Sequence, residues 1–394
     1  MLFYTRNHVA NTLLIIIIII TLLFIQLSNT NGIVLNENKN IVRQKFEPLT
    51  LHTTTTVKRQ IECNESITTV NNERVLCKNE LLFEERFHGD LNETIWSREI
   101  RIPLEPDYEF CVYRNDGTVK THDGMLEITP KILEESYGDN AVYIGKMILA
   151  DCTSNVVEEC QREGAGYHIL QPVISGRLTT KESFNFRYGK IEINAKFPQG
   201  DWLFPEMYLI PRYESNDDKY SFAKVILGLA RGNDILYNDE REYGGKFLEF
   251  GFRFGDSEHF QYKNITKFRR SGAWTKDFHK YTTIWSDIGM TFLIDGTKIG
   301  FLNLQEEFVD PTSKIQRFAP FEQEFYLTIG VGVGGLRVFE DDLLSDQYVK
   351  PWKNLGAKAM LNFWKAKNRW LPSWKRQSGS EMGLKIKSIR IWSV

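Results

Sequence analysis

The chain of 394 residues combines 42% hydrophobic with 25% charged side chains, which is typical of a folded globular protein and excludes disorder for most of its length. Its 49 lysines and arginines against 51 aspartates and glutamates give a formal net charge of -2, which argues against nucleic acid as a partner. Aromatic residues make up 13% of the chain, and they favour strands and carbohydrate-facing surfaces.

Residues 1–31 are predicted to form a secretory signal peptide. The basic residue Arg6 precedes an apolar run from Leu13 to Leu27, and small and polar residues follow. An uncleaved membrane anchor is the alternative. However, Thr21 and Gln26 interrupt the run, which is shorter than the roughly 20 residues that a span needs. The sequence therefore predicts a secreted, extracellular protein without a membrane span in the mature chain.

Residues 32–61 are polar and show no helical or strand period, so they are predicted to form a mobile leader. Within them, Lys58-Arg59 is either a processing site or an exposed charge pair. The remaining residues, 62–394, are expected to form one domain.

Four of the five cysteines fall into two short-range pairs, as expected in an oxidising compartment. Cys63 and Cys77 are 14 residues apart, Cys152 and Cys160 are eight apart, and Cys111 is unmatched. We predict two disulfides. Five buried thiols, or a pairing that includes Cys111, remain open as alternatives. Sequons at Asn64, Asn92 and Asn264 are compatible with glycosylation of a secreted protein.

Several segments alternate between apolar and polar residues with the period of a strand. In Lys190–Phe197 and Phe325–Val333 the apolar residues share one face. Met290–Ile294 and Lys298–Leu302 flank Asp295-Gly296, which is typical of a hairpin turn.

A helical alternative exists only for Ala357–Trp370, where Met360, Phe363 and Trp364 could share a stripe. Many strands without intervening helices predict an all-β sandwich or jelly roll from about Leu81 to Val394.

Cofactor and metal motifs give no positive prediction. Gly330, Gly332 and Gly335 fit a GxGxxG pattern, but they lie in an alternating segment without a βαβ unit and are interpreted as sheet glycines. The sequence contains no HExxH, paired CxxC, GxSxG or P-loop motif, and its seven histidines have no metal-ligand spacing. No cofactor and no metal site are expected.

The segment from Tyr188 to Asn233 contains the motifs of a known family. They are Tyr188-Gly189-Lys190-Ile191-Glu192-Ile193, Gly200-Asp201-Trp202-Leu203-Phe204-Pro205, Leu209-Ile210-Pro211 and Arg231-Gly232-Asn233. With matching stretches elsewhere, this chain resembles the glucanase-like domain of the invertebrate β-1,3-glucan recognition proteins, also called Gram-negative-bacteria-binding proteins. The resemblance covers nearly all of residues 62–394. It implies a concanavalin A-like jelly-roll sandwich of the family-sixteen glycoside hydrolases, with a glucan cleft across the concave sheet.

The resemblance also locates the catalytic strand. Active relatives carry Glu-x-Asp-x-x-Glu there, with a bulge that redirects the last acid, and retaining hydrolysis needs two carboxyl groups roughly 5 to 5.5 Å apart. Placed by its Arg-Gly-Asn tail, this pattern falls on Lys224, Ile226 and Leu229. We therefore expect no hydrolysis by the family mechanism, and we assign no catalytic residue.

Six residues are candidates for contact with glucan or for support of the cleft. By resemblance, Trp202 matches a sugar-facing tryptophan, and Phe204, Tyr208 and Phe250 stand where active relatives have tryptophan. Arg231 and Asn233 match the family tail, where they are expected to brace the cleft wall. The aromatic candidates are Trp202, Phe204, Tyr208 and Phe250. The alternative for the aromatic set is a place in the hydrophobic core.

Three functions follow from this reading. The first is a non-catalytic pattern-recognition protein of innate immunity that binds β-1,3-glucan or another microbial surface polysaccharide. The second is a β-1,3-glucanase that uses relocated carboxylates such as Glu206 or Glu214. The third is a scaffold that engages extracellular immune proteases while the cleft is vestigial. A Lys224 side chain bound to a neighbouring acid would favour the vestigial cleft. The segment before Leu81 is too short for the separate glucan-binding sandwich that many of these proteins carry.

Overall fold

Alternating apolar and polar residues build two large antiparallel sheets whose apolar faces pack on each other. The computed structural model describes residues 63–213, 222–255, 260–304, 321–346, 348–376 and 381–394, all within the unit Ile61–Val394. The predicted signal peptide, the leader and the Lys58-Arg59 pair lie outside these residues.

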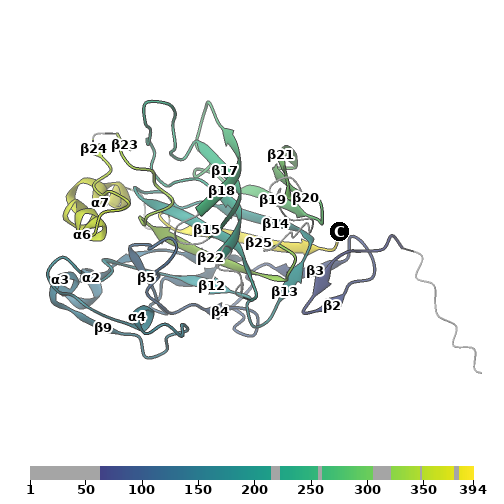
Figure 1. Cartoon of the computed structure of the whole chain (residues 1–394), viewed down its shortest axis with the longest axis horizontal. Helices are drawn as coiled ribbons and strands as arrows, with labels where there is room; N and C mark the ends of the chain where they lie inside the picture. Colours follow the sequence, from purple (N-terminus) through teal and green to yellow (C-terminus); the bar gives the residue numbers. More distant parts are fainter. Residues whose placement is uncertain (1–62, 214–221, 256–259, 305–320, 347, 377–380) are drawn as a thin grey trace, which may run out of the picture. The chain divides into compact units, whose positions relative to one another are not determined.

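The first sheet, which we call the outer sheet, contains ten of the described strands (Figure 1). They are β1 (Thr69–Val70), β2 (Glu73–Arg74), β4 (Ser97–Arg98), β12 (Arg177–Thr179), β13 (Asn185–Arg187), β15 (Leu203–Pro211), β16 (Phe222–Leu229), β17 (Phe247–Gly255), β18 (Phe260–Phe268) and β22 (Phe325–Val333). Its main path runs β18-β17-β16-β15-β22-β13-β1-β2.

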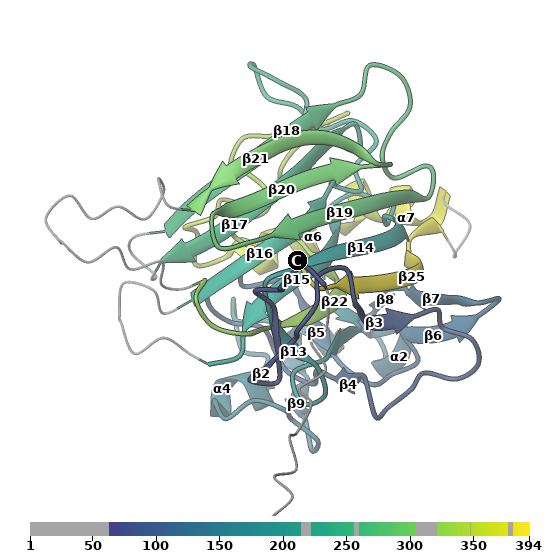
Figure 2. The ribbon, with the colours of Figure 1, turned by 90° about the vertical axis from the view of Figure 1, so that its right-hand side faces the viewer.

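Eight of the described strands form the second sheet, whose order β21-β20-β19-β14-β25 can be followed in Figure 2. They are β3 (Leu81–Glu85), β6 (Val119–His122), β7 (Met125–Ile128), β14 (Gly189–Lys196), β19 (His279–Trp285), β20 (Gly289–Ile294), β21 (Thr297–Asn303) and β25 (Leu384–Trp392).

Smaller elements complete the described part of the chain. The strands are β5 (Cys111–Tyr113), β8 (Lys131–Ile132) and β11 (Val173–Ser175) in one small sheet, β9 (Lys146–Ile148) with β10 (Gln161–Glu163), and β23 (Leu344–Ser345) with β24 (Tyr348–Val349). The helices are α2 (Leu133–Tyr137), α3 (Ala141–Ile144), α4 (Val157–Cys160), α6 (Ala359–Lys365) and α7 (Lys367–Arg376).

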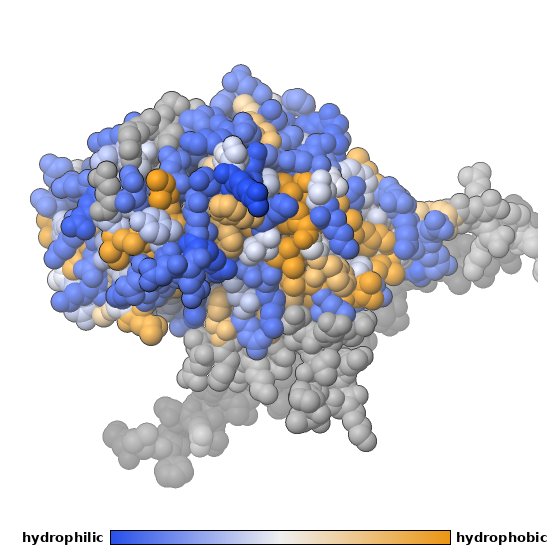
Figure 3. Space-filling view, turned by 90° about the horizontal axis from the view of Figure 1, so that it is seen from above, coloured by the Kyte–Doolittle hydropathy of each residue, from blue (hydrophilic) through white to orange (hydrophobic). Residues whose placement is uncertain are grey.

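The core between the two large sheets is rich in aromatic rings. Phe197 stacks on Tyr281 with ring centroids 4.3 Å apart, and Trp285 contacts both Phe186 and Phe325 edge-on. In β14 every second residue from Gly189 is buried, as the alternating pattern predicts. The aromatic composition is therefore explained in large part by the core. On the face shown in Figure 3, hydrophilic side chains predominate and hydrophobic ones form separate areas between them.

Several predicted elements are confirmed. The hairpin β20–β21 turns at Asp295 and Gly296, with φ of 51° and 81°, which is the left-handed conformation that this pair of residues favours. Gly330 and Gly332 lie in β22 as predicted, whereas Gly335 lies after the strand with a φ of 83° and is not a sheet glycine. Residues 357–370 contain all of α6 and the first part of α7. Both predicted disulfides are present, and Cys111 is a buried free thiol.

No helix in the described ranges is both long and apolar enough to span a membrane. The sequon residues Asn64 and Asn92 are exposed. Asn264 is half-buried, and its side-chain amide donates to Glu249 Oε1 at 3.2 Å. The structure therefore offers Asn64 and Asn92 to a glycosylating enzyme more readily than Asn264.

Candidate functional site

Strand β16 carries Lys224, Ile226 and Leu229, on which the resemblance places the acid pattern of active relatives, and it lies in the interior of the outer sheet between β15 and β17. Its register with β17 shifts between Ile226 and Leu229, as expected for the bulge. Gly228 lies in this shift with a φ of 149°, and a Cβ there would come within 2.9 Å of the Tyr281 ring. The bulge therefore turns Leu229 to the same face of the outer sheet as Lys224 and Ile226. This face points away from the second sheet, and we call it the outer face.

Lys224 does not project into an open cleft. Its ammonium forms an ion pair with Asp107, and Arg253 Nη1 lies 3.4 Å from the other Asp107 oxygen. All three side chains are buried. Burial alone would raise the pKa of Asp107, but the charges of Lys224 and Arg253 outweigh it, so that this pKa lies below its usual value.

Asp107 belongs to what we call the covering segment, residues 99–113. The segment is hydrogen-bonded to β22 and to the turn after it: Phe110 N donates to Val333 O at 2.8 Å, and Leu336 N donates to Asp107 O at 2.8 Å. The Phe110 ring packs edge-on against Trp352 at 5.3 Å. The centre of the outer face, where a sugar chain would lie in an open cleft, is occupied by protein side chains.

Glu206, one of the two alternative catalytic acids, lies next to this centre on β15. Tyr113 Oη is 3.0 Å from each of its carboxylate oxygens, and Arg177 Nε is 3.8 Å away. Arg177 also lies 3.4 Å from a carboxylate oxygen of Glu99. Glu206 has no exposed surface, so no sugar reaches it in this conformation. Glu214 lies outside the described residues.

A small cavity of about 150 Å³ remains between the covering segment and the sheet, lined by Glu109, Lys224 and Arg177 among others. Burial, together with the charges of Asp107 and Glu206, raises the pKa of Glu109 to about 8. Glu109 is therefore largely protonated at neutral pH, so it adds little negative charge beside Asp107 and Glu206.

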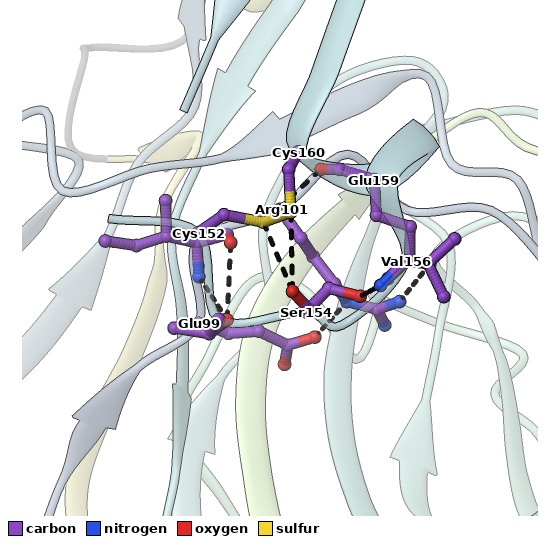
Figure 4. The surroundings of a disulfide bond; sticks show 9 residues. Glu99, Arg101, Cys152, Ser154, Val156, Glu159 and Cys160 are labelled. Carbon is purple, nitrogen blue, oxygen red and sulfur yellow. Dashed lines mark hydrogen bonds and ion pairs between the residues drawn. A yellow bond between two sulfur atoms is a disulfide. The ribbon is translucent and has the colours of Figure 1, made fainter. Parts of the chain in front are cut away.

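A disulfide supports the covering segment from the side (Figure 4). Cys152–Cys160 closes a short loop that holds Glu159, whose Oε1 accepts from Arg101 Nη1 at 2.7 Å. The backbone joins in, because Ile102 N donates to Glu159 O at 2.7 Å. The crosslink thus fixes the start of the segment that covers β16.

Three of the aromatic candidates lie on the outer face, but they are buried beneath other side chains. Trp202 packs edge-on against Trp352 at 4.9 Å, and Phe204 packs against Phe339 at 6.0 Å. The Tyr208 ring lies under the Lys224 ammonium, 4.7 Å from its centroid. The expected stacking of Trp202, Phe204 and Tyr208 on sugar is not available in this conformation, because 0–1% of each residue is exposed.

Phe250 requires a correction. Its ring lies 5.4 Å from Phe292 on β20 and 6.2 Å from Tyr281 on β19, between the two sheets. Neighbouring Glu249 faces the other side, where it meets Arg231 at 2.7 Å. Because successive side chains of a strand point to opposite faces, Phe250 is a core residue and not part of a cleft.

Arg231 and Asn233 make hydrogen bonds to loop residues. Arg231 Nε donates to Val338 O at 2.8 Å, beyond its ion pair with Glu249. Asn233 Oδ1 accepts from Trp202 N at 3.0 Å, and its Nδ2 donates to Asp201 Oδ1 at 3.2 Å. Both side chains are buried and hold loops together.

Sequence reasoning missed the residues that fill the centre of the outer face. They are Glu99, Asp107, Glu109 and Tyr113. Asp107 is 117 positions from Lys224, and no local pattern signals that the two will meet. The one indication in the sequence was Lys224 itself. A lysine in the middle of a buried strand needs a carboxylate partner, and its neighbours in the chain offer none.

Comparisons with known proteins agree with this architecture. No family model matches the chain. The β-1,3-glucan-binding protein 1 of Galleria mellonella is 35% identical over 351 residues, which cover 84% of this chain and 67% of that protein. The Gram-negative bacteria-binding protein 1 of Drosophila melanogaster is 34% identical over 336 residues, which cover 81% of this chain and 65% of that protein.

Among solved structures, the laminarinase from Rhodothermus marinus superposes with a TM-score of 0.51 at 14% identity, over 80% of this chain and 98% of that one. This likeness supports the jelly-roll fold that the two packed sheets display. Identity above 30% with the curated relatives, over two thirds or more of the Galleria protein, establishes the relationship. The chain therefore belongs to the family of β-1,3-glucan-binding and Gram-negative-bacteria-binding proteins.

Proposed function

We propose that this chain is a secreted, non-catalytic recognition protein that binds β-1,3-glucan or a related polysaccharide of microbial surfaces. Its relatives are named for binding β-1,3-glucan or Gram-negative bacteria. The observation that carries the non-catalytic part is the buried ion pair between Lys224 and Asp107 at the first expected acid position.

The chemistry at the three positions supports the absence of hydrolysis. Retaining hydrolysis needs a carboxylate nucleophile and a carboxylic acid about 5 to 5.5 Å apart. Lys224 is a cation, which would repel the positive charge that develops on the sugar, and Ile226 and Leu229 cannot transfer a proton. Glu206 is buried against Tyr113 and Arg177, which leaves it no access to a sugar.

Secretion is supported by the predicted signal peptide and by the cysteines. Disulfides persist in oxidising compartments, and the described residues contain two. Buried Cys111 does not disturb this pattern, because burial raises the pKa of its thiol well above the usual value and keeps it unreactive.

Two assays on the same preparation test the proposal. The full mature chain should sediment with insoluble β-1,3-glucan and should release no reducing ends from a soluble β-1,3-glucan over many hours. Insoluble cellulose, a β-1,4-linked glucan, serves as the matched polymer control. Failure to sediment with β-1,3-glucan would show that this polymer is not the ligand. Release of reducing ends that is lost in Glu206→Gln would show that the chain is a glucanase.

The occupied outer face also favours a second function. If the covered centre is vestigial, the chain can act as a scaffold for an extracellular immune protease, with its ligand-binding surface elsewhere. Pull-down of such a protease from body fluid should then be equal with and without added glucan. Capture that requires glucan would favour the recognition protein instead.

A further inference from the structure

A larger groove lies at one end of the outer sheet, apart from the covered centre. The turn before β15, the turn after β16, the β23–β24 hairpin and helix α7 form its walls, and its volume is about 1090 Å³. Figure 1 shows the hairpin beside α7. This volume slightly exceeds the range of about 300–1000 Å³ that is usual for ligand sites in proteins. None of Lys224, Ile226 and Leu229 lines this groove.

The floor of the groove is held in place by hydrogen bonds around Asp201. Tyr348 Oη donates to Asp201 Oδ2 at 2.7 Å, and Trp202 Nε1 donates to Tyr348 Oη at 3.1 Å. On the helix side, Ser373 Oγ accepts from Asp201 N at 2.9 Å, and Trp374 Nε1 donates to Asp201 O at 2.9 Å. A floor that is ordered before binding lowers the entropy lost when a ligand is bound.

The rim of the groove combines apolar and polar side chains that reach solvent. Ile235 is 45% exposed and Val349 is 47% exposed. Asn368 and Arg369 are exposed on α7 beside them. A sugar ring presents C–H groups on its faces and hydroxyls at its edge. Apolar contacts suit the first, while amide, carboxylate and guanidinium groups suit the second.

The lining offers hydrogen-bond acceptors as well as donors. Asp234 and Asp346 line the groove together with the Asn368 amide and the Arg369 guanidinium, and Lys276 Nζ lies 3.4 Å from Asp234. Carboxylate oxygens accept hydrogen bonds, while amide and guanidinium N–H groups donate them. The groove therefore presents partners for both the hydrogen and the oxygen of a sugar hydroxyl.

We propose that this end groove, and not the covered centre of the outer face, is the glucan site of the chain. The inference rests on the proposed function and names where that function resides. It also explains how a chain whose ancestral cleft is filled by Asp107 can still bind a polysaccharide.

Substitutions at the rim test the groove against matched controls. Asn368→Ala and Arg369→Ala remove rim hydrogen-bonding groups, and Ile235→Trp fills the groove from an exposed position. The controls are Asn362→Ala on α6 and Lys375→Ala on α7, which remove exposed side chains of the same types outside the groove lining. Thermal unfolding should show all five variants folded.

The readout is sedimentation with insoluble β-1,3-glucan. Each rim variant should lower the affinity for the glucan by about tenfold, because it removes one good hydrogen bond or fills the space that the sugar needs. The controls should match the wild type. Wild type that does not sediment overturns the proposed function. If the wild type sediments and the rim variants bind with the same affinity, the proposed function stands and the assignment of the glucan site to the groove is wrong. A soluble β-1,3-glucan should compete for binding, and the absence of competition would contradict a glucan site in the groove.

Discussion

Asp107 links the covering segment to the outer sheet through two cations, Lys224 and Arg253. Removing one member of a buried ion pair leaves a charge that the interior does not compensate. We expect Asp107→Asn to lower the free energy of unfolding by about 3–5 kcal/mol, measured in urea. Glu65→Gln, which breaks the exposed pair with Arg74, is the control and should change stability little. Equal effects of the two variants would contradict a buried, coupled site.

Glu109 makes stability depend on pH. Its pKa is about 8 in the folded chain and near 4.5 when unfolded, so between these values the folded state holds a proton that the unfolded state has lost. This contribution is fully present below about pH 4.5 and is lost as pH rises to 8. Stability should therefore fall by up to about 1.4 kcal/mol per pH unit from this group.

Glu109→Gln removes that dependence and is the measurement to make. Unfolding of both proteins in urea at pH 5.5 and at pH 8 should show a smaller decrease for the variant. Comparison of the two chains cancels the contribution of His122, whose pKa is raised by its hydrogen bonds to Glu127 and Asp123. An identical decrease in both chains would show that Glu109 does not hold the extra proton.

At the scale of the elements, β16 and the covering segment together decide what the outer face can do. Restoring the family acids by Lys224→Glu, Ile226→Asp and Leu229→Glu in one chain should not create a hydrolase. Asp107 and the covering segment would still fill the space above the strand, and the new carboxylates would face Asp107 without the compensating lysine. We expect a destabilised protein.

Two measurements check this triple variant. Its midpoint of thermal unfolding should lie below that of the wild type, and a soluble β-1,3-glucan incubated with it should yield no reducing ends. Measurable turnover would show that the segment opens and that only the acids were missing.

Elements with a clear local pattern could be predicted. The alternation in β14 and β22 and the Asp295-Gly296 turn are signals that neighbouring residues carry by themselves. Helices α2 to α4 were not predicted, because each is only four or five residues long and no full apolar stripe fits in that length. The strand β5 was missed for a related reason, since three buried residues show no alternation.

At the scale of the whole molecule, the two-sheet sandwich follows from many strands with one apolar face each. Aromatic residues suit both the core and a cleft, and the packing decides where each one lies. Phe250 lies between the sheets, and Trp202 and Phe204 lie under Phe339 and Trp352. A residue type that suits both places cannot be assigned from its own neighbours in the chain.

The sequence by itself determined the all-β class and the resemblance to the family, and it favoured the two short disulfides, because each rests on residues close together in the chain or on short motifs. The tertiary structure alone decided that Asp107 pairs with Lys224, that Glu206 is sealed under Tyr113, and that an open groove lies beside α7. These depend on contacts between segments about a hundred or more positions apart, whose meeting is set by the packing of the whole sandwich.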